Sequence, residues 1–368
     1  MPKKKRPPAA PASRDRGSLA LDRRRFLEGM ALSGGAASLL GSLSGVALAQ
    51  SPAGAADSPG TPESACGSQP PPLKDLAGRT AYISAASDGI GLGIARACSN
   101  AGMQVVLGYR NTERLQRALA LFKPGNAGVL PLRHDVTDRQ GWQRLLREIK
   151  SRFGNLHLLV NNAGIKTLGK ASEARADEWD HAVAVNFTAI YNGVSACLPH
   201  MLAHGEGGHI VTTASIGGLL PGARAGIYTA TKIAAVGLME ALRIELESTT
   251  VGTSVFCPGL VRTDNDPHGS HPAPPPAAPG RPAFRFAGMD PLEAGERVLN
   301  GVIHNDLFIV SHAEFKPGIQ ERVAAILASV PDEPVPAARL DAQRLALRAG
   351  IYSRELAHRQ QRRSSFRV

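Results

Sequence analysis

A tyrosine and a lysine four residues apart are the side chains of this 368-residue chain best suited to acid–base chemistry. If their segment is helical, Tyr228 and Lys232 lie on one face of a single turn. A free phenol, with a pKa of about 10, exchanges protons poorly at neutral pH, but a neighbouring cation favours the phenolate. The pair is therefore a candidate for moving a proton to or from a substrate oxygen.

Two further polar residues could complete a site around this pair. Ser215 precedes Tyr228 by thirteen residues and follows an apolar run of strand length, so its hydroxyl can reach the same substrate oxygen. Asn186 lies within an otherwise apolar helical stretch, where a polar side chain needs a reason to be buried.

A glycine-containing turn upstream has the composition of a phosphate site. Residues 84–91 read Ser-Ala-Ala-Ser-Asp-Gly-Ile-Gly, between an apolar run and a helical segment. Glycines let backbone N–H groups approach a pyrophosphate at a helix N-terminus, where the helix dipole favours anions. Residues 161–164, Asn-Asn-Ala-Gly, end a later apolar run, and Asp135 ends another, where its carboxylate can accept a hydrogen bond from an adenine amine.

The elements that must position these residues are strands alternating with helices. Such alternation predicts an α/β fold: a single domain with a doubly wound, Rossmann-type, parallel seven-stranded sheet. Ligands of such sheets bind at the carboxyl ends of the strands, where all the motifs above fall. The seven expected strands are Thr80–Ser84, Gln104–Leu107, Gly128–Leu132, Leu156–Val160, His209–Thr213, Thr253–Cys257 and Leu307–Val310.

Over residues 76–330 the sequence resembles the short-chain dehydrogenase/reductase family, whose fingerprint is Thr-Gly-x-x-x-Gly-x-Gly and whose fourth strand ends Asn-Asn-Ala-Gly. The chain departs from the fingerprint at two positions: Ser84 replaces the threonine and Ala85 the first glycine. The resemblance implies that Tyr228 exchanges the substrate proton, that Lys232 lowers the pKa of Tyr228 and holds the nicotinamide ribose, and that Ser215 binds the reacting oxygen. It also implies that Asn186 supports a water-linked proton path.

The same resemblance implies the residues that bind the cofactor. The Pro-Gly segment after the sixth strand would meet the nicotinamide amide through its backbone. The complete set is Ser84, Ser87, Asp88, Gly89, Ile90, Gly91, Tyr109, Arg110, Asp135, Val136, Asn162, Ala163, Gly164, Tyr228, Lys232, Pro258, Gly259, Val261 and Thr263.

The end of the second strand favours one dinucleotide over the other. A carboxylate there would accept from the ribose 2′-hydroxyl of NAD, whereas an arginine accommodates the 2′-phosphate of NADP. The chain reads Leu107-Gly108-Tyr109-Arg110-Asn111, with no carboxylate. We therefore expect NADP(H), while NAD(H) stays possible because a surface arginine can also be simply solvated.

These observations predict an oxidoreductase that transfers a hydride between NADP(H) or NAD(H) and an alcohol/carbonyl pair. Ile165, the segment 218–220 and a proline-rich loop at 267–282 suggest an apolar lining, suited to a hydrophobic secondary alcohol or ketone. The alternatives are a dinucleotide-binding redox sensor and a scaffold protein, in either of which the site would go unused. No metal is expected: Cys66, Cys98, Cys197 and Cys257 are scattered, without the spacing of a zinc site or of a disulfide framework.

Composition and charge exclude several other classes. A hydrophobic fraction of 43% with 20% charged residues is typical of a globular protein. The net charge of +11 raises the question of a nucleic-acid partner, but residues 1–49 and 338–368 carry +6 each and leave the body at −1. No nucleic acid is therefore expected. The resemblance implies a homo-oligomer, a dimer or tetramer.

The N-terminus resembles a bacterial twin-arginine export signal. Residues 23–27, Arg-Arg-Arg-Phe-Leu, precede a mildly apolar stretch, Gly29–Leu48, and a small-residue site at Ala47-Leu48-Ala49. This layout predicts a periplasmic or extracytoplasmic location without a stable membrane span after processing; otherwise the protein is cytoplasmic.

The expected organisation is a disordered signal peptide at 1–49, a flexible linker at 50–72, the dehydrogenase domain at 73–330 and a basic helical tail at 331–368. One helix is expected in that tail, from about Ala337 to His358, with a solvated or subunit-contacting face.

Overall fold

The computed structural model of the chain describes residues 69–123, 128–262, 288–346 and 350–365. The expected signal peptide, most of the linker, Thr263 and the proline-rich loop at 267–282 lie outside the described residues.

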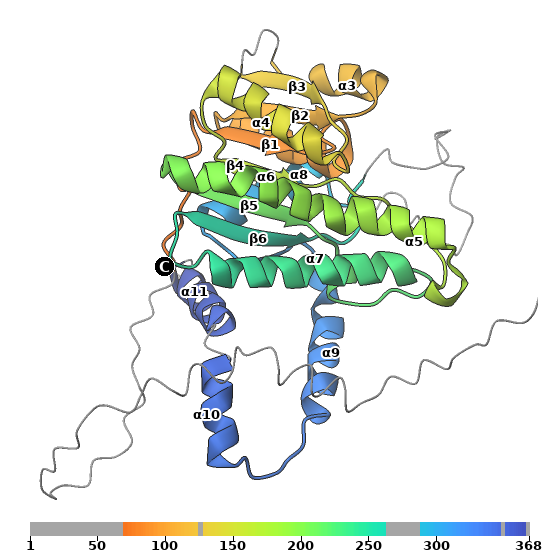
Figure 1. Ribbon diagram of the computed structural model, residues 1–368, viewed down its shortest axis with the longest axis vertical. Coiled ribbons are helices and arrows are strands. Elements are labelled where there is room, and N and C mark those ends of the chain that lie inside the picture. Colours follow the sequence, from red (N-terminus) through yellow and green to blue (C-terminus); the bar gives the residue numbers. More distant parts are fainter. Residues whose placement is uncertain (1–68, 124–127, 263–287, 347–349, 366–368) are drawn as a thin grey trace, which may run out of the picture. The chain divides into compact units, whose positions relative to one another are not determined.

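Seven parallel strands form one sheet, as the sequence predicted (Figure 1). Their order in the sheet is β3-β2-β1-β4-β5-β6-β7. From β1 the chain builds outward through β2 and β3, then returns to place β4 on the other side of β1. This reversal creates a crevice between the carboxyl ends of β1 and β4, where sheets of this kind bind ligands. The strands are β1 (Thr80–Ile83), β2 (Gln104–Tyr109), β3 (Val129–Arg133), β4 (Leu158–Asn161), β5 (Gly208–Thr213), β6 (Val251–Cys257) and β7 (Phe308–Val310).

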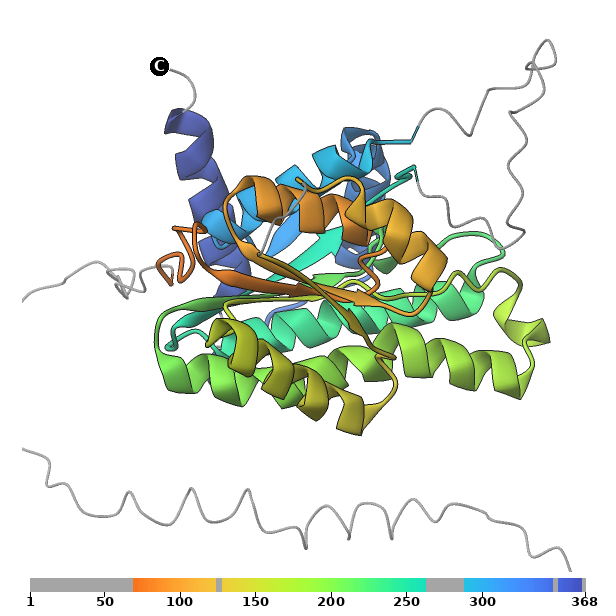
Figure 2. The same ribbon diagram turned by 90° about the horizontal axis from the view of Figure 1, so that it is seen from above.

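Helices cover both faces of the sheet, which confirms the doubly wound α/β class (Figure 2). One face packs against α2 (Gly89–Asn100), α3 (Thr112–Leu119) and α8 (Pro291–Ile303). The other packs against α4 (Arg139–Phe153), α6 (Ala189–His204) and α7 (Gly226–Glu245).

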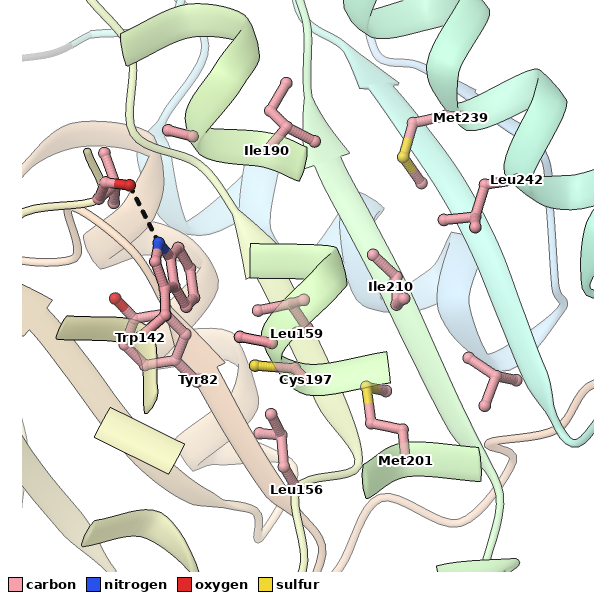
Figure 3. Close-up of a cluster of buried hydrophobic side chains, with 14 of the residues drawn as sticks. Tyr82, Trp142, Leu156, Leu159, Ile190, Cys197, Met201, Ile210, Met239 and Leu242 are labelled. Carbon is pink, nitrogen blue, oxygen red and sulfur yellow. Dashed lines mark hydrogen bonds between the residues drawn. The ribbon is translucent and has the colours of Figure 1, made fainter. Parts of the chain in front are cut away.

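The core beneath α4, α6 and α7 also fixes the loop that follows β3 (Figure 3). Trp142 is buried edge-on against Tyr82, with ring centroids 5.6 Å apart, and its indole N–H donates to the carbonyl of Val136 at 2.9 Å. The Tyr82 hydroxyl lies 2.7 Å from Nδ1 of His134. The segment that contains the expected adenine contact, Asp135, is therefore held from both sides by buried aromatic residues.

The longest helical stretch, Ala176–His204, comprises α5 (Ala176–Val183), a π-helical segment η2 (Ala184–Thr188) and α6. Among the described residues it alone is long and apolar enough to pass for a membrane span, with a mean hydropathy of 1.2. Just over half of its most apolar window is buried inside the fold, and its α6 part contributes to the core. These contacts identify it as a core helix.

The C-terminal tail differs from its prediction. Two helices stand where one was expected, α10 (Ala337–Ala346) and α11 (Ile351–Ser365). Arg362 pairs with the buried carboxylate of Asp306 at 2.7 Å and Arg359 with the same group at 3.1 Å, while Arg354 pairs with Glu247. The interpretation as a solvated or subunit-contacting face is therefore wrong for this side of α11, because its arginines neutralise carboxylates of the body.

Helix α9 (Lys316–Ala328) presents apolar side chains to solvent. Val323, Ile326 and Leu327 are 45%, 49% and 66% exposed, and their spacing places them on one face of the helix. No described residue of the chain covers this face. It is an exposed apolar stripe of the kind that marks a contact surface.

Candidate active site

The carboxyl ends of β1 and β4 are joined by the side chain of Ser84. Its hydroxyl oxygen accepts from the backbone N–H groups of Asn162 at 2.8 Å and Ala163 at 2.9 Å, and the Asn162 amide donates to the Ser84 carbonyl at 3.1 Å. A Cβ on Gly91 would lie 2.4 Å from the carbonyl oxygen of Ala85 and 2.5 Å from the Asn162 amide. Only glycine therefore fits at position 91, and Ser84 braces the crevice.

The N-terminus of α2 is suited to an anion although it begins with an acidic residue. Asp88 caps the helix, accepting from the N–H of Gly89 at 2.6 Å, and its second oxygen lies 3.4 Å from the guanidinium of Arg114. This cation on α3 offsets the negative charge beside the turn. With the charge offset, the helix dipole and the free N–H groups fit a phosphate. Ser87 and Ile90, half-buried, flank this position.

Ala85 occupies a backbone conformation that favours glycine. Its φ is +52°, in the left-handed region, at the position where the family fingerprint has its first glycine. A Cβ in this region crowds the following carbonyl and costs roughly 1–2 kcal/mol. The turn thus keeps its shape despite the substitution, with local strain.

The adenosine end of the expected site brings Arg110 and Asp135 together. Their side chains are 3.5 Å apart and both reach solvent. Hydrogen bonds from the backbone N–H and hydroxyl of Thr137, at 2.9 and 2.7 Å, together with Arg110, lower the pKa of Asp135. Asp135 is therefore an ionised acceptor. Tyr109, the last residue of β2, lies half-buried beside this pair.

Three of the expected catalytic residues converge at the carboxyl end of β5. Ser215 precedes a 3-10 turn, η3 (Ile216–Gly218), and accepts from the N–H of Gly217 at 3.1 Å. Tyr228, in the first turn of α7, hydrogen-bonds to the Ser215 side chain. One turn later, Lys232 donates to the carbonyl of Thr213 at 2.9 Å, with its Nζ 5.7 Å from the Tyr228 ring centroid.

Asn186 reaches the same place from the opposite side. It lies in the π-helical segment η2, a distortion often found at functional sites. Its Oδ1 accepts from the N–H of Ile165 at 2.8 Å, and its Nδ2 donates to the Ile165 carbonyl at 3.0 Å and to the Thr231 hydroxyl at 3.2 Å. A Cβ on Gly164 would lie 3.3 Å from Lys232 Nζ and 3.4 Å from Asn186 Oδ1. The burial of Asn186 is thus explained by its hydrogen bonds to the N–H and the carbonyl of Ile165.

Burial controls the electrostatics of the tyrosine–lysine pair. It raises the pKa of Tyr228, which the hydrogen bond to Ser215 partly offsets, and it lowers the pKa of Lys232 to about 8. Burial and Ser215 are the causes of this shift in the described structure, and the expectation that Lys232 lowers the pKa of Tyr228 stays a prediction.

Apolar residues follow the polar ones of this region in the chain. Leu219, Leu220 and Ile165 are half-buried, and Leu260, next to Gly259, is 42% exposed. The Pro-Gly segment is fixed to the catalytic segment, since the N–H of Ile216 donates to the carbonyl of Pro258 at 2.8 Å. Val261 follows in an isolated bridge to Met289.

Sequence reasoning missed two residues of this region. Arg114, which pairs with Asp88, is the third residue of α3, a position from which a side chain can reach back toward the preceding strand end. His312, which contacts Gly259, comes two residues after β7. The rule that ligands bind at the carboxyl ends of parallel strands, applied to the seventh strand as well, could have identified it.

A cluster of potential metal ligands lies at the other end of the strands, where β4 and β5 begin. His157, His204 and Glu206 bring ligand atoms within 4.8 Å of one another. His157 accepts from the N–H of Thr80 at 3.1 Å and lies 2.9 Å from Glu206, while His204 contacts the Leu156 carbonyl at 3.0 Å and the N–H of Glu206 at 3.1 Å. All four ring nitrogens thus have protein partners. The cluster takes no part in the site described above.

The fold and these residues define a dinucleotide-binding α/β protein with a tyrosine–lysine pair at its carboxyl edge. Comparison with known proteins gives the same result. The short chain dehydrogenase family matches residues 79–271. The chain therefore belongs to the short-chain dehydrogenase family of oxidoreductases.

Individual relatives agree over most of the chain. A C alpha-dehydrogenase of Sphingobium sp. (strain NBRC 103272 / SYK-6) is 30% identical over 272 residues, which cover 70% of this chain and 88% of that protein. A short-chain dehydrogenase structure from Novosphingobium aromaticivorans superposes with a TM-score of 0.64 at 32% identity, covering 77% of this chain and 99% of that one. The structure of a Burkholderia phymatum family member in complex with NAD gives a TM-score of 0.63 at 29% identity, covering 71% and 99%.

Replacing Lys232 by methionine should change the pH dependence of stability. Below pH 8 the folded protein holds a buried ammonium, whereas the unfolded chain keeps its lysine pKa near 10.5, so the unfolded state binds more protons between these values. The free energy of unfolding of the wild type should therefore rise, relative to Lys232→Met, by about 3 kcal/mol from pH 7 to pH 10.5. Urea unfolding of both proteins across this range measures the difference. Parallel curves would show that the lysine is not desolvated.

Ala85→Gly should relieve strain in the phosphate turn. Removal of the Cβ recovers roughly 1–2 kcal/mol and is opposed by a glycine entropy cost of roughly 0.5–1 kcal/mol, so we expect stability equal to or up to about 1 kcal/mol above the wild type. The matched control is Ala86→Gly, the buried neighbour with a negative φ, which should destabilise. If thermal unfolding shows the same loss for both variants, position 85 carries no strain.

Proposed function

We propose that this protein oxidises or reduces an alcohol/carbonyl pair, with Tyr228 exchanging the proton of the reacting oxygen. The observation that carries the proposal is the convergence of Ser215, Tyr228 and Lys232 beside the crevice between β1 and β4. Such a set has no evident use in a scaffold. Membership of an oxidoreductase family supports the same reading.

The residues of the proposed cofactor site fit a nicotinamide dinucleotide. The N-terminus of α2 favours an anion, and the lack of a side chain at Gly91 lets the backbone approach a pyrophosphate closely. The lack of a side chain at Gly164 leaves space beside Lys232 Nζ. When bound, the nicotinamide supplies the hydride acceptor or donor for the substrate carbon.

The chain's own side chains would then manage the proton and the orientation of the substrate. Ser215 donates a hydrogen bond to the substrate oxygen and holds it at the Tyr228 hydroxyl, which gives or takes the proton. Lys232, largely protonated at neutral pH with a pKa of about 8, holds the ribose and supplies positive charge near the phenol. Asn186 fixes the backbone at Ile165 beside this lysine and supports a path for protons toward solvent.

The substrate class that we propose is a hydrophobic secondary alcohol or ketone. Leu219, Leu220 and Ile165 give the surroundings of Ser215 an apolar character that would favour such a molecule. The relative named C alpha-dehydrogenase supports an alcohol carbon as the site of oxidation.

Tyr228→Phe should lower kcat at least about 100-fold, because it removes the proton donor and acceptor but keeps the ring. The dissociation constant of the nucleotide should change less than about twofold. The control is Tyr191→Phe, which alters an exposed tyrosine on α6 and should leave both quantities unchanged. Steady-state kinetics on a panel of alcohols and carbonyls, with nucleotide titration, measures them. Wild-type turnover by Tyr228→Phe would remove the catalytic assignment.

The same panel separates the two alternatives of other classes. A protein that binds nucleotide but turns over no alcohol or carbonyl would be a redox sensor. A protein that binds neither NAD(H) nor NADP(H) would be a scaffold with an unused site.

For the coenzyme we propose a preference for NADP(H). The support is Arg110, exposed at the end of β2 and held 3.5 Å from Asp135, with no carboxylate at the position that binds the 2′-hydroxyl of NAD. The Burkholderia relative was solved with NAD, so family membership alone does not decide the choice.

Arg110→Ala should erode this preference. Loss of a charge-assisted contact to the 2′-phosphate weakens NADP(H) binding by roughly 1.5–3 kcal/mol and leaves NAD(H) binding nearly unchanged. Arg117→Ala, at an exposed position of the neighbouring helix α3, is the matched control. Titration of each variant with both coenzymes gives the four dissociation constants. Equal affinities of the wild type for the two coenzymes would refute the preference.

We further propose that the protein works as a homo-oligomer, a dimer or tetramer. The exposed apolar stripe of α9 supports this, because Val323, Ile326 and Leu327 find no cover within the described residues and an isolated helix of this length is marginally stable in water. Light scattering of the purified protein gives its mass in solution. A monomer at micromolar concentration would oppose the proposal.

The location that we propose is outside the cytoplasm, after removal of residues 1–49. The support is the arginine motif at 23–27 with its small-residue site at 47–49. An exported dehydrogenase has no cytosolic coenzyme pool, so it should leave the cell with its nucleotide bound. Cell fractionation and N-terminal sequencing should find a chain that begins near Gln50. An intact Met1 on cytosolic protein would contradict export.

A further inference from the structure

His312 links the end of β7 to the Pro-Gly segment that follows β6. It is buried, two residues beyond β7, and its Nδ1 accepts from the N–H of Gly259 at 3.1 Å. Its Nε2 lies 3.0 Å from the carbonyl oxygen of Leu260. One imidazole ring thus binds two successive residues of the backbone.

The surroundings of the ring determine its tautomer. The hydroxyl of Ser311 lies 2.8 Å from Nδ1, which also faces the N–H of Gly259, so Nδ1 must be the acceptor. The carbonyl of Leu260 faces Nε2, which must therefore carry the proton. The contacts of His312 thus give its ring one acceptor nitrogen and one donor nitrogen.

Packing supports the same arrangement. A Cβ on Gly259 would lie 2.8 Å from the His312 ring and 2.6 Å from the ring of Phe315. The two rings are themselves in contact, with centroids 6.2 Å apart. The absence of a side chain at Gly259 is thus explained by His312 and Phe315, which press directly on its backbone.

The two hydrogen bonds of His312 are not equally important for the segment. The carbonyl of Leu260 also accepts from the N–H of Met289 at 2.9 Å, so it keeps a partner without the histidine. For the N–H of Gly259, His312 is the partner that the described part of the chain provides. The acceptor nitrogen is therefore the one that fixes Gly259.

The segment held in this way is also tied to the catalytic residues. The carbonyl of Pro258 accepts from the N–H of Ile216 at 2.8 Å, immediately after Ser215. Ser215 therefore borders the Pro258–Leu260 backbone on one side, and His312 fixes it on the other. A change at His312 would be transmitted through Gly259.

We propose that His312 is a positioning residue that sets the backbone of Pro258–Val261 for the nicotinamide half of the cofactor. The inference rests on the proposed function, with the nicotinamide at this segment as the family resemblance implies. His312 acts through Gly259 and does not itself touch the substrate. Loss of its acceptor nitrogen should weaken recognition of the nicotinamide without affecting the adenosine half at Arg110 and Asp135.

Three variants of His312 test its acceptor nitrogen Nδ1 and its donor nitrogen Nε2 separately. His312→Phe keeps an aromatic ring and removes both hydrogen bonds. His312→Asn places an amide oxygen near the Nδ1 position and so keeps the acceptor for Gly259. His312→Gln places an amide nitrogen near the Nε2 position and keeps only the donor for Leu260. The matched control is His304→Phe, a histidine at the end of α8 that precedes β7, whereas His312 follows it.

Two probes locate any effect on the cofactor. NADP⁺ contains the nicotinamide, and 2′-phospho-ADP-ribose lacks it but keeps the adenosine, its 2′-phosphate, the pyrophosphate and the second ribose. His312→Phe should raise the dissociation constant of NADP⁺ about tenfold or more, as expected when a buried donor loses its acceptor, and change that of 2′-phospho-ADP-ribose less than twofold. His312→Asn should restore most of the affinity for NADP⁺ and His312→Gln little of it.

Other outcomes would overturn the inference. Equal weakening of both probes by His312→Phe would show a general structural role, and unchanged affinities would show none. If His312→Phe does not fold, equal affinities of the Asn and Gln variants for NADP⁺ have the same meaning. Wild-type protein that binds neither these probes nor NAD⁺ would overturn the proposed function, and the inference with it. If the wild type binds both probes, the variants test the role of His312 alone.

Discussion

The hydroxyl of Ser84 holds together the two strands on which the whole site depends. β1 and β4 are neighbours in the sheet although two strands, β2 and β3, lie between them in the sequence, and the crevice lies at their carboxyl ends. By accepting from the N–H groups of Asn162 and Ala163, Ser84 fixes the ends of the two strands relative to each other. The chain then leads from Ala163 through Gly164 to Ile165, whose backbone is clamped by Asn186. The phosphate turn and the catalytic cluster are thereby parts of one hydrogen-bonded path.

The catalytic cluster is held at a cost in solvation. Burial raises the pKa of Tyr228 and lowers the pKa of Lys232 to about 8, so both side chains are displaced from their ordinary values in the direction that favours their neutral forms. Groups displaced in this way concentrate at functional sites. The hydrogen bonds to Ser215 and to the Thr213 carbonyl only partly compensate for the lost water. A ligand that brings polar groups to this cluster would offset part of the desolvation cost of Tyr228 and Lys232. Its binding would therefore be favoured.

The sequence predicted the sheet well because each strand is an apolar run that has one possible use, burial between two helical layers. The sequence also indicated that Tyr228, Lys232 and Ser215 lie together, because Tyr228 and Lys232 are neighbours in the chain and Ser215 follows a strand. Contacts that join distant segments could not be read in the same way. The pairing of Arg114 with Asp88 depends on the angle at which α3 leaves β2. The docking of α11 depends on Asp306, an acidic residue that nothing in its local sequence distinguishes from a solvated one. His312 binds the segment through the N–H of Gly259 and the carbonyl of Leu260, which leave no trace in residue types, so its position after β7 is the only signal that the sequence contains.

The basic C-terminal helix and the proposed positioning residue act on the two ends of the same strand. β7 has three residues and lies at the edge of the sheet, where a strand so short gains little from pairing alone. At its beginning, Glu355 of α11 accepts from the N–H of Leu307 at 2.9 Å, and Arg359 donates to the carbonyl of Phe308. At its end, His312 binds Gly259. An edge strand fixed by side chains at both ends can hold its last residues in register with β6. Arg359 of α11 contacts β7 at its beginning. By fixing this strand, it therefore also helps to hold the residues at its carboxyl end.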